Sequence, residues 1–255
     1  MFAHVVRHCN LPRSNGAPRH GPERLQDCDA NRREARDCSQ LATCQPRALD
    51  CSAGRARDGV VGPDGAAYCY LLGIYLGDGT VVVQRGVWLQ VVNDRRYPGI
   101  SNEILAAMAE TFPGRLPRVH PSSVGESDVL CISHPAVLRA FPQHGAGRKH
   151  LRPIVLTDWQ LELTHAHPGS LLRGLIHSDG CRVVNRFQTM LPSGRTADYS
   201  YVRYFFTNHS ADIRRIFVEH CELLGIRVTQ SNHRNLSVSH RKSVALLEEV
   251  VGPKT

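Results

Sequence analysis

The 255-residue chain lacks several features that mark common classes of protein. It has no run of about 20 apolar residues, the length that a membrane-spanning helix needs. Its N-terminus has no apolar stretch of the signal-peptide type. Its nine cysteines form no C-x-x-C pair, which argues against a zinc knuckle, and their odd number argues against a secreted disulfide framework. We therefore expect a soluble, cytoplasmic protein with no membrane partner.

Lysine is scarce: the chain has three lysines and 28 arginines, with a formal net charge of +8. Arginine is the better bidentate partner of phosphate and guanine. A GC-rich genome produces the same bias, so composition alone does not select a nucleic-acid partner. Residues 66–255 hold 21 basic and 15 acidic side chains, so most of the excess charge lies in this part of the chain.

Residues 1–65 contain no isoleucine and few large apolar side chains. They are rich in Arg, Pro, Gly, Ala and Cys, and no helical or strand period persists along them. We expect a low-order N-terminal segment here. A helix-turn-helix within residues 22–45 is disfavoured, because the apolar spacing that would pack one is missing.

What the chain does have is a nine-residue pattern that occurs twice, 101 residues apart. Residues 71–79 read LLGIYLGDG, and residues 172–180 read LRGLIHSDG. Each copy is an apolar, helix-like run with small residues at two positions four apart, and each ends in Asp-Gly. A repeat of this kind predicts two similar half-domains, which we place at residues 66–150 and 151–255.

The residues that follow each motif predict the same order of elements: helix, strand, strand, helix, strand, strand, helix. In the first copy the helices are expected at 68–77, 100–111 and 135–141, and the strands at 81–83, 87–93, 119 and 129–133. In the second copy the helices are expected at 169–178, 211–224 and 241–251, and the strands at 181–190, 199–207, 226–231 and 235–239. The basic, Gly-rich segment 142–153 is expected to link the halves. The fold class is thus α+β, with two pseudo-symmetric αββαββα repeats and antiparallel sheets.

The spacing of the small residues predicts how the two motif helices pack. Residues four apart share one helix face, so Gly73 and Gly77 can lie against Gly174 and Ser178 and let the two backbones approach closely. The C-terminal ends then meet, which brings Asp78 and Asp179 together near the pseudo-two-fold axis. Two carboxylates at the negative ends of two helices are unfavourable unless cations are present.

Mg²⁺ is the expected cation, because it is held by one or two carboxylates together with waters and substrate phosphates. Two such ions can activate a water and stabilise the leaving oxygen when a phosphodiester is hydrolysed. The structural alternative is a simple turn, since Asp-Gly occurs four times in the chain. That alternative is weakened because the other positions of the motif also agree in kind.

At these residues the chain resembles the LAGLIDADG family of homing endonucleases, with Leu, Gly, Asp and Gly in register in both motifs. The resemblance covers residues 66–255 and has the spacing of single-chain, monomeric members. It implies that the motif helices join the half-domains and that saddle-shaped sheets lie along the major groove of double-stranded DNA. It also implies that Asp78 and Asp179 bind divalent metal and cleave both strands. Gly79 and Gly180 would end the helices and let the backbone approach the metals.

Family members often place a Lys or Arg near the scissile phosphate. By this resemblance Lys242 is the expected catalytic assistant, with Arg241 and Lys149 as alternatives, and each is otherwise an ordinary surface charge. Polar residues alternate with apolar ones on the predicted strands of the second repeat, as in a sheet with one wet face. The expected DNA-binding residues are Arg182, Arg186, Arg203, Arg227, Asn235 and, in the linker, Lys149. The first repeat has fewer polar residues on its predicted strands. Its candidate DNA-binding residues are Gln84, Arg85, Gln90, Asn93, Arg95 and Arg96.

Two functional hypotheses follow. The first is a metal-dependent, site-specific endonuclease that cleaves double-stranded DNA, and both retained acids favour it. The second is a DNA-binding transcriptional regulator that uses the same fold without cleaving. A splicing role is disfavoured because the chain ends Gly-Pro-Lys-Thr, without the terminal His-Asn of an intein.

Overall fold

The computed structural model describes residues 62, 64–123 and 125–252, all of which belong to one unit, residues 48–255. The expected low-order segment 1–65 lies outside the described residues, except for its positions 62, 64 and 65. Among the described residues, no helix combines the length and apolarity that crossing a membrane would take.

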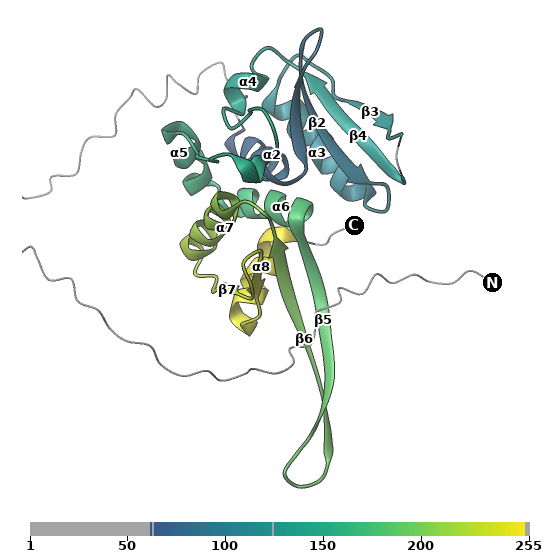
Figure 1. Cartoon of the computed structure of the whole chain (residues 1–255), viewed down its shortest axis with the longest axis vertical. Coiled ribbons are helices and arrows are strands. Elements are labelled where there is room, and N and C mark those ends of the chain that lie inside the picture. Colours follow the sequence, from purple (N-terminus) through teal and green to yellow (C-terminus); the bar gives the residue numbers. More distant parts are fainter. Residues whose placement is uncertain (1–61, 63, 124, 253–255) are drawn as a thin grey trace, which may run out of the picture. The chain divides into compact units, whose positions relative to one another are not determined.

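The described residues form two copies of the predicted order (Figure 1). The first copy runs α2 (Gly65–Gly77), β1 (Gly79–Val83), β2 (Val87–Asp94), α3 (Pro98–Thr111), β3 (Arg118–Pro121), β4 (Ser127–Ser133) and α4 (Val137–Ala140). The second runs α6 (Pro168–Asp179), β5 (Gly180–Met190), β6 (Thr196–Thr207), α7 (Ala211–Leu223), β7 (Thr229–Gln230), β8 (Asn235–Val238) and α8 (Arg241–Val251). Each copy has a four-stranded antiparallel sheet, ordered β1-β2-β4-β3 and β5-β6-β8-β7. The predicted α+β class with two αββαββα repeats is confirmed.

The linker holds more structure than the sequence predicted. A short 3₁₀ helix, η1 (Lys149–Leu151), lies within it, and a further helix, α5 (Asp158–Ala166), precedes α6. A capping box begins α5: the Gln160 side chain turns back and accepts a hydrogen bond from the Thr157 backbone N–H at 3.0 Å. The T-x-x-Q spacing at residues 157–160 is thus a local helix signal that lies outside the repeated pattern.

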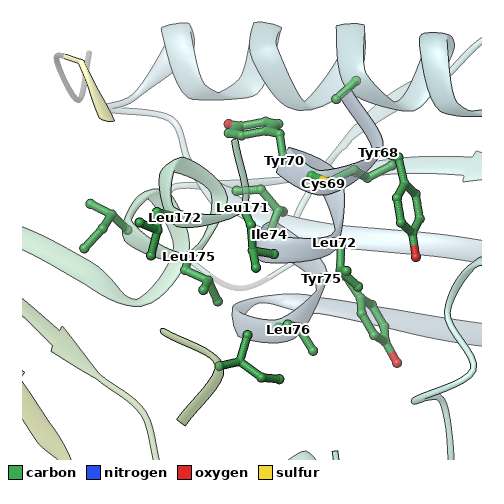
Figure 2. Close-up of a cluster of buried hydrophobic side chains, with 14 of the residues drawn as sticks. Tyr68, Cys69, Tyr70, Leu72, Ile74, Tyr75, Leu76, Leu171, Leu172 and Leu175 are labelled. Carbon is green, nitrogen blue, oxygen red and sulfur yellow. The ribbon is translucent and has the colours of Figure 1, made fainter. Parts of the chain in front are cut away.

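Helix α2 is apolar on all sides because it lies at the centre of the core. Asp64 begins it by accepting hydrogen bonds from the backbone N–H groups of Ala66 and Ala67. Its side chains from Tyr68 to Leu76 are buried. Figure 2 shows Tyr70 and Ile74 of α2 beside Leu171 of α6, and one hydrophobic core joins both repeats.

The β5–β6 hairpin is much longer than its neighbours in the second sheet. Strand β6 pairs with β8 only at residues 204–207, whereas it pairs with β5 along residues 196–206. Figure 1 shows the outer part of the hairpin extending past the other strands. Both faces of this outer part are therefore exposed, and nearly all of its side chains are accessible to solvent.

Candidate functional site

The two motif helices touch through their backbones at Gly73 and Gly174. A Cβ atom on Gly73 would lie 2.5 Å from the Leu171 carbonyl oxygen, and one on Gly174 would lie 2.2 Å from the Tyr70 carbonyl oxygen. One turn further on, a Cβ on Gly77 would lie 2.3 Å from Ser178 Oγ. The Ser178 hydroxyl is turned back onto its own helix, where it donates to the carbonyl oxygens of residues 174 and 175. We call Gly73, Gly77, Gly174 and Ser178 the seam.

Gly79 and Gly180 let each strand leave its motif helix at once. A Cβ on Gly79 would lie 2.6 Å from the Cα of Tyr75, and one on Gly180 would lie 2.7 Å from the Cα of Ile176. Any side chain at these positions would therefore press on the last turn of the helix. The sequence had suggested that these glycines let backbone approach metals, whereas the geometry explains them by the sharp helix-to-strand turn.

The seam positions the two acids at neighbouring helix ends. Asp78 is the C-cap of α2 and is exposed, and Asp179 is the last residue of α6 and is half-buried. A Cβ on Gly77 would lie only 3.0 Å from Asp179 Oδ2, so the carboxylate of one motif reaches the end of the other helix. Asn208, just after β6, donates a hydrogen bond from Nδ2 to the same oxygen at 2.6 Å and fixes its orientation.

Lys149 brings a positive charge from the linker to this place. Its Nζ donates hydrogen bonds to the last carbonyl groups of α2, at 2.8 Å for Gly77, 3.1 Å for Leu76, and also to Tyr75. These carbonyls have no partner within the helix, so Lys149 caps its negative end. Burial lowers the pKa of Lys149 to about 8, while the nearby Asp179 and Asp78 act in the opposite direction. The ammonium group therefore lies within electrostatic reach of both acids.

An open cavity of about 580 Å³ lies beside Asp179 and Lys149. Its walls come from the end of α2, the start of β1, the linker and the turn after β6. Most of its titratable lining side chains are basic or imidazole: His144, Arg148, Lys149, His150, Arg152 and His209. The rings of His150 and His209 pack with their centroids 5.3 Å apart, and the positive charge of Arg234 lowers the pKa of His209. The cavity thus suits an anionic group.

Lys242 is not brought to this place. It is the second residue of α8, its side chain is exposed, and it is not among the residues that line the cavity. The sequence offered Lys242, Arg241 and Lys149 as basic residues that could assist the two acids. Of these three, Lys149 is the residue whose contacts place it beside Asp78 and Asp179. The sequence could not favour Lys149 over Lys242, because the path of the linker is set by tertiary contacts.

The strand register assigns each candidate DNA-binding residue of the second sheet to a face. Tyr204 and Phe206 are buried under the helices, and Arg182 pairs with Tyr204 across the β5–β6 ladder, so Arg182 and Arg186 lie on the helix side. Arg182 forms an ion pair with Glu248 of α8 at 2.8 Å. The expectation of a wet face is therefore corrected for Arg182, whereas Arg186 lies in the outer part of the hairpin, where both faces are exposed.

Arg203 and Asn235 do lie on the open face, which the helices leave uncovered. Arg203 pairs with Val183, and Asn235 pairs with Thr207, both on the side opposite the buried residues. Arg203 donates a hydrogen bond to Ser237 Oγ at 2.8 Å and stacks over the Phe205 ring at 4.8 Å. Arg227 lies in the exposed segment before β7, and its backbone N–H donates to Ser243 Oγ.

The first sheet uses several of its polar candidates internally. Asn93 donates to Ser101 Oγ at 2.8 Å, while Arg95 and Arg96 form ion pairs with Asp128 and Asp94. Gln90 lies on the open face, and so do Trp88 and Arg118, which the sequence did not single out. The Arg118 guanidinium lies 5.9 Å from the centre of the Trp88 ring. In the sequence, the polar residues Arg118 and His120 on either side of Val119 already indicated a strand with one polar face.

The donor set fits a divalent cation only with help from a substrate. In the part of the chain that the structure describes, no three His, Cys, Asp or Glu side chains are grouped to hold a metal ion. Asp78 and Asp179 supply two carboxylates, and Mg²⁺ commonly takes that number and completes its shell with waters and phosphate oxygens. The phosphate oxygens of a bound substrate would have to complete such a shell.

Comparison with models of protein families finds no match, and none is found among the curated proteins. Among solved structures, the chain is similar to the meganuclease I-SmaMI bound to uncleaveable DNA, at 13% identity over 74% of this chain and 85% of that chain, with a TM-score of 0.46. It is also similar to the LAGLIDADG meganuclease I-AabMI bound to uncleaved DNA, at 13% identity over 72% and 82%, with a TM-score of 0.45. A third is the I-LtrWI LAGLIDADG homing endonuclease bound to target DNA, at 11% identity over 72% and 83%, with a TM-score of 0.44. These three solved structures are LAGLIDADG meganucleases or homing endonucleases, and the likeness to them is one of fold.

Proposed function

We propose that the chain is a divalent-metal-dependent endonuclease that cuts double-stranded DNA at the paired ends of α2 and α6. The observation that supports this proposal is that Lys149 Nζ and Asp179 Oδ2 both lie close to Gly77 at the end of α2, where Asp78 follows as the C-cap. Two acids from two similar halves supply one carboxylate toward each strand of a duplex. A single chain with both motifs would act as a monomer.

Each group has a role that follows from its position. Asp78 and Asp179 would hold Mg²⁺ or another divalent cation, which supplies charge stabilisation and an activated water when bound. Asn208 holds one oxygen of the Asp179 carboxylate and so fixes the direction in which this carboxylate faces. Lys149 offsets the negative potential of the helix ends, so the phosphate backbone can approach two carboxylates without strong repulsion.

The open faces of the two sheets would carry the duplex on either side of the cut. Arg203, Asn235 and Arg118 lie on these faces and can contact phosphates or base edges. Arg182 is placed less well for this role because it is already paired with Glu248. The first sheet offers fewer such groups, so we expect the second repeat to contribute more of the base contacts.

The proposal is tested by incubating the purified chain with Mg²⁺ and a library of random duplexes, and then sequencing the ends. Staggered cuts at a common sequence are expected, and they should disappear in Asp78→Asn and Asp179→Asn. Both substitutions keep the size of the side chain and remove its charge, so loss of cutting with unchanged folding assigns the effect to the carboxylates. Binding that weakens with salt, without cuts in any divalent metal, would instead favour a DNA-binding regulator.

A further inference from the structure

The exposed end of the β5–β6 hairpin presents an apolar surface on the open side of the second sheet. By the register, Val183, Phe187, Tyr199 and Tyr201 lie on the same side as Arg203. Their exposed fractions are 36%, 47%, 45% and 39%. Phe187 stacks on Tyr199 with ring centres 5.2 Å apart and meets Tyr201 edge-on at 6.1 Å, so the rings form one continuous patch. We call these four residues the apolar hairpin face.

Two polar side chains beside this face make contacts within the sheet. Asn185 lies between Val183 and Phe187, and its Nδ2 donates to the Tyr201 hydroxyl at 3.2 Å. Arg203 donates to Ser237 and stacks on Phe205. A duplex lying on this part of the sheet would therefore meet mainly the rings of Phe187 and Tyr199 and the methyl groups of Val183, with the tyrosine hydroxyls at their edge.

The positive charge of the hairpin favours a negatively charged partner for the apolar hairpin face. Residues 180–207 contain four arginines and one aspartate, a net charge of +3. A second copy of the chain would bring two such positive hairpins together, whereas DNA would neutralise the charge. A two-stranded β-ribbon also has the width that the major groove of B-DNA admits.

On the base edges of the major groove, the apolar group is the C5-methyl of thymine. We propose that the apolar hairpin face reads thymine methyl groups, so that the half-site bound by the second repeat is rich in thymine. This inference rests on the proposed DNA-binding function and adds to it a chemical rule of specificity. Phe187 and Tyr199, at the centre of the patch, are the residues expected to make the contacts.

The test compares thymine with uracil, which lacks only the methyl group. Duplexes that the full chain retains from a random library are sequenced and resynthesised with either thymine or uracil, and their affinities are measured without metal. Burying one methyl group is worth about fourfold in affinity. The thymine duplex should therefore bind about fourfold more tightly for each methyl contacted, and thymines should cluster on one side of the selected sequence.

Two variants separate the face from general hairpin effects. Phe187→Ala should abolish most of the difference between thymine and uracil duplexes. Met190→Ala is the matched control, because Met190 is 75% exposed on the opposite side of the same strand, and it should leave the difference intact. Both side chains are exposed, so neither substitution should alter folding, which thermal denaturation checks.

The outcomes are distinguishable. Equal affinity of the wild-type chain for thymine and uracil duplexes would overturn the inference and leave DNA binding standing. Failure to bind any duplex at low salt would remove the proposed function itself. A Phe187→Ala variant that changes the sedimentation of the chain, with no effect on the thymine preference, would overturn the inference in favour of a self-contact.

Discussion

The substitution Gly174→Ala tests the seam most sharply. The added Cβ would lie 2.2 Å from the Tyr70 carbonyl oxygen and 3.0 Å from the Gly73 Cα. Ordinary van der Waals contact of a Cβ begins near 3.4 Å, so at Tyr70 the helices would have to separate by about 1.2 Å. Both neighbours are backbone atoms of a buried helix, and no rotamer change can relieve the clash.

Overpacking of this kind lowers the free energy of unfolding by about 1–3 kcal/mol. Because the contact is with rigid backbone atoms, we expect Gly174→Ala to cost about 3 kcal/mol. Alanine is the better helix former by about 1 kcal/mol, which offsets only part of this cost. The net cost is then about 2 kcal/mol, and at roughly 2–4 °C for each kcal/mol in a domain of this size the melting temperature should fall by roughly 4–8 °C. Calorimetry of the wild-type and variant chains measures the shift.

Gly169→Ala supplies the control within the same helix. A Cβ there would meet only the Val250 methyl groups, at 3.3 Å and 3.6 Å, so this variant should be neutral within about 0.5 kcal/mol. The Gly77→Ala clash is mainly with the Ser178 side chain, so adding Ser178→Gly should relieve most of it and leave only the 3.0 Å contact with Asp179 Oδ2. A Gly174→Ala chain as stable as wild type would refute the close approach of the two helices.

Three further predictions concern other contacts. Lys149→Met should reduce DNA cleavage in a gel assay by about 100-fold or more, because it removes a preorganised positive charge. The control variant Lys242→Met changes an exposed side chain and should cut as the wild-type chain does. Equal losses of cleavage in the two variants would refute the placement of Lys149. Glu103→Gln removes the charge that pairs with Arg173 across the repeats at 2.6 Å. Because both groups are partly exposed, urea unfolding should show that the free energy of unfolding falls by only about 1 kcal/mol. Burial lowers the pKa of His220 below its usual value, so the unfolded chain binds this proton more readily and stability should fall as the pH drops from about 7 to about 5. His220→Asn should flatten that part of the profile, and an unchanged slope would contradict the assignment.

The order of elements was predictable because it depends on local patterns. Gly73 and Gly77, spaced by four within an apolar run, predict a helix that another helix can approach, and the same spacing recurs at Gly174 and Ser178. The Gly225 stop after α7 and the polar alternation around β8 also follow from local chemistry.

The faces of the strands were not predictable in the same way. Arg182 and Arg203 both look like members of an alternating polar row, yet the register puts them on opposite sides of the sheet. On a half-exposed hairpin, neither face has enough large apolar residues to reveal which one the helices cover. The sequence likewise could not distinguish Lys149 from the other two lysines, because only the path of the linker brings its ammonium group to the end of α2.

The central claim is that the acids at the end of the seam cut DNA. The most direct measurement is cleavage of a selected duplex by the wild-type, Asp78→Asn and Asp179→Asn chains in the presence of Mg²⁺. We expect cuts on both strands by the wild-type chain and none by either variant, with all three proteins binding the duplex. Cleavage that persists in both variants, or a wild-type chain that binds the duplex and never cuts it, would contradict the account.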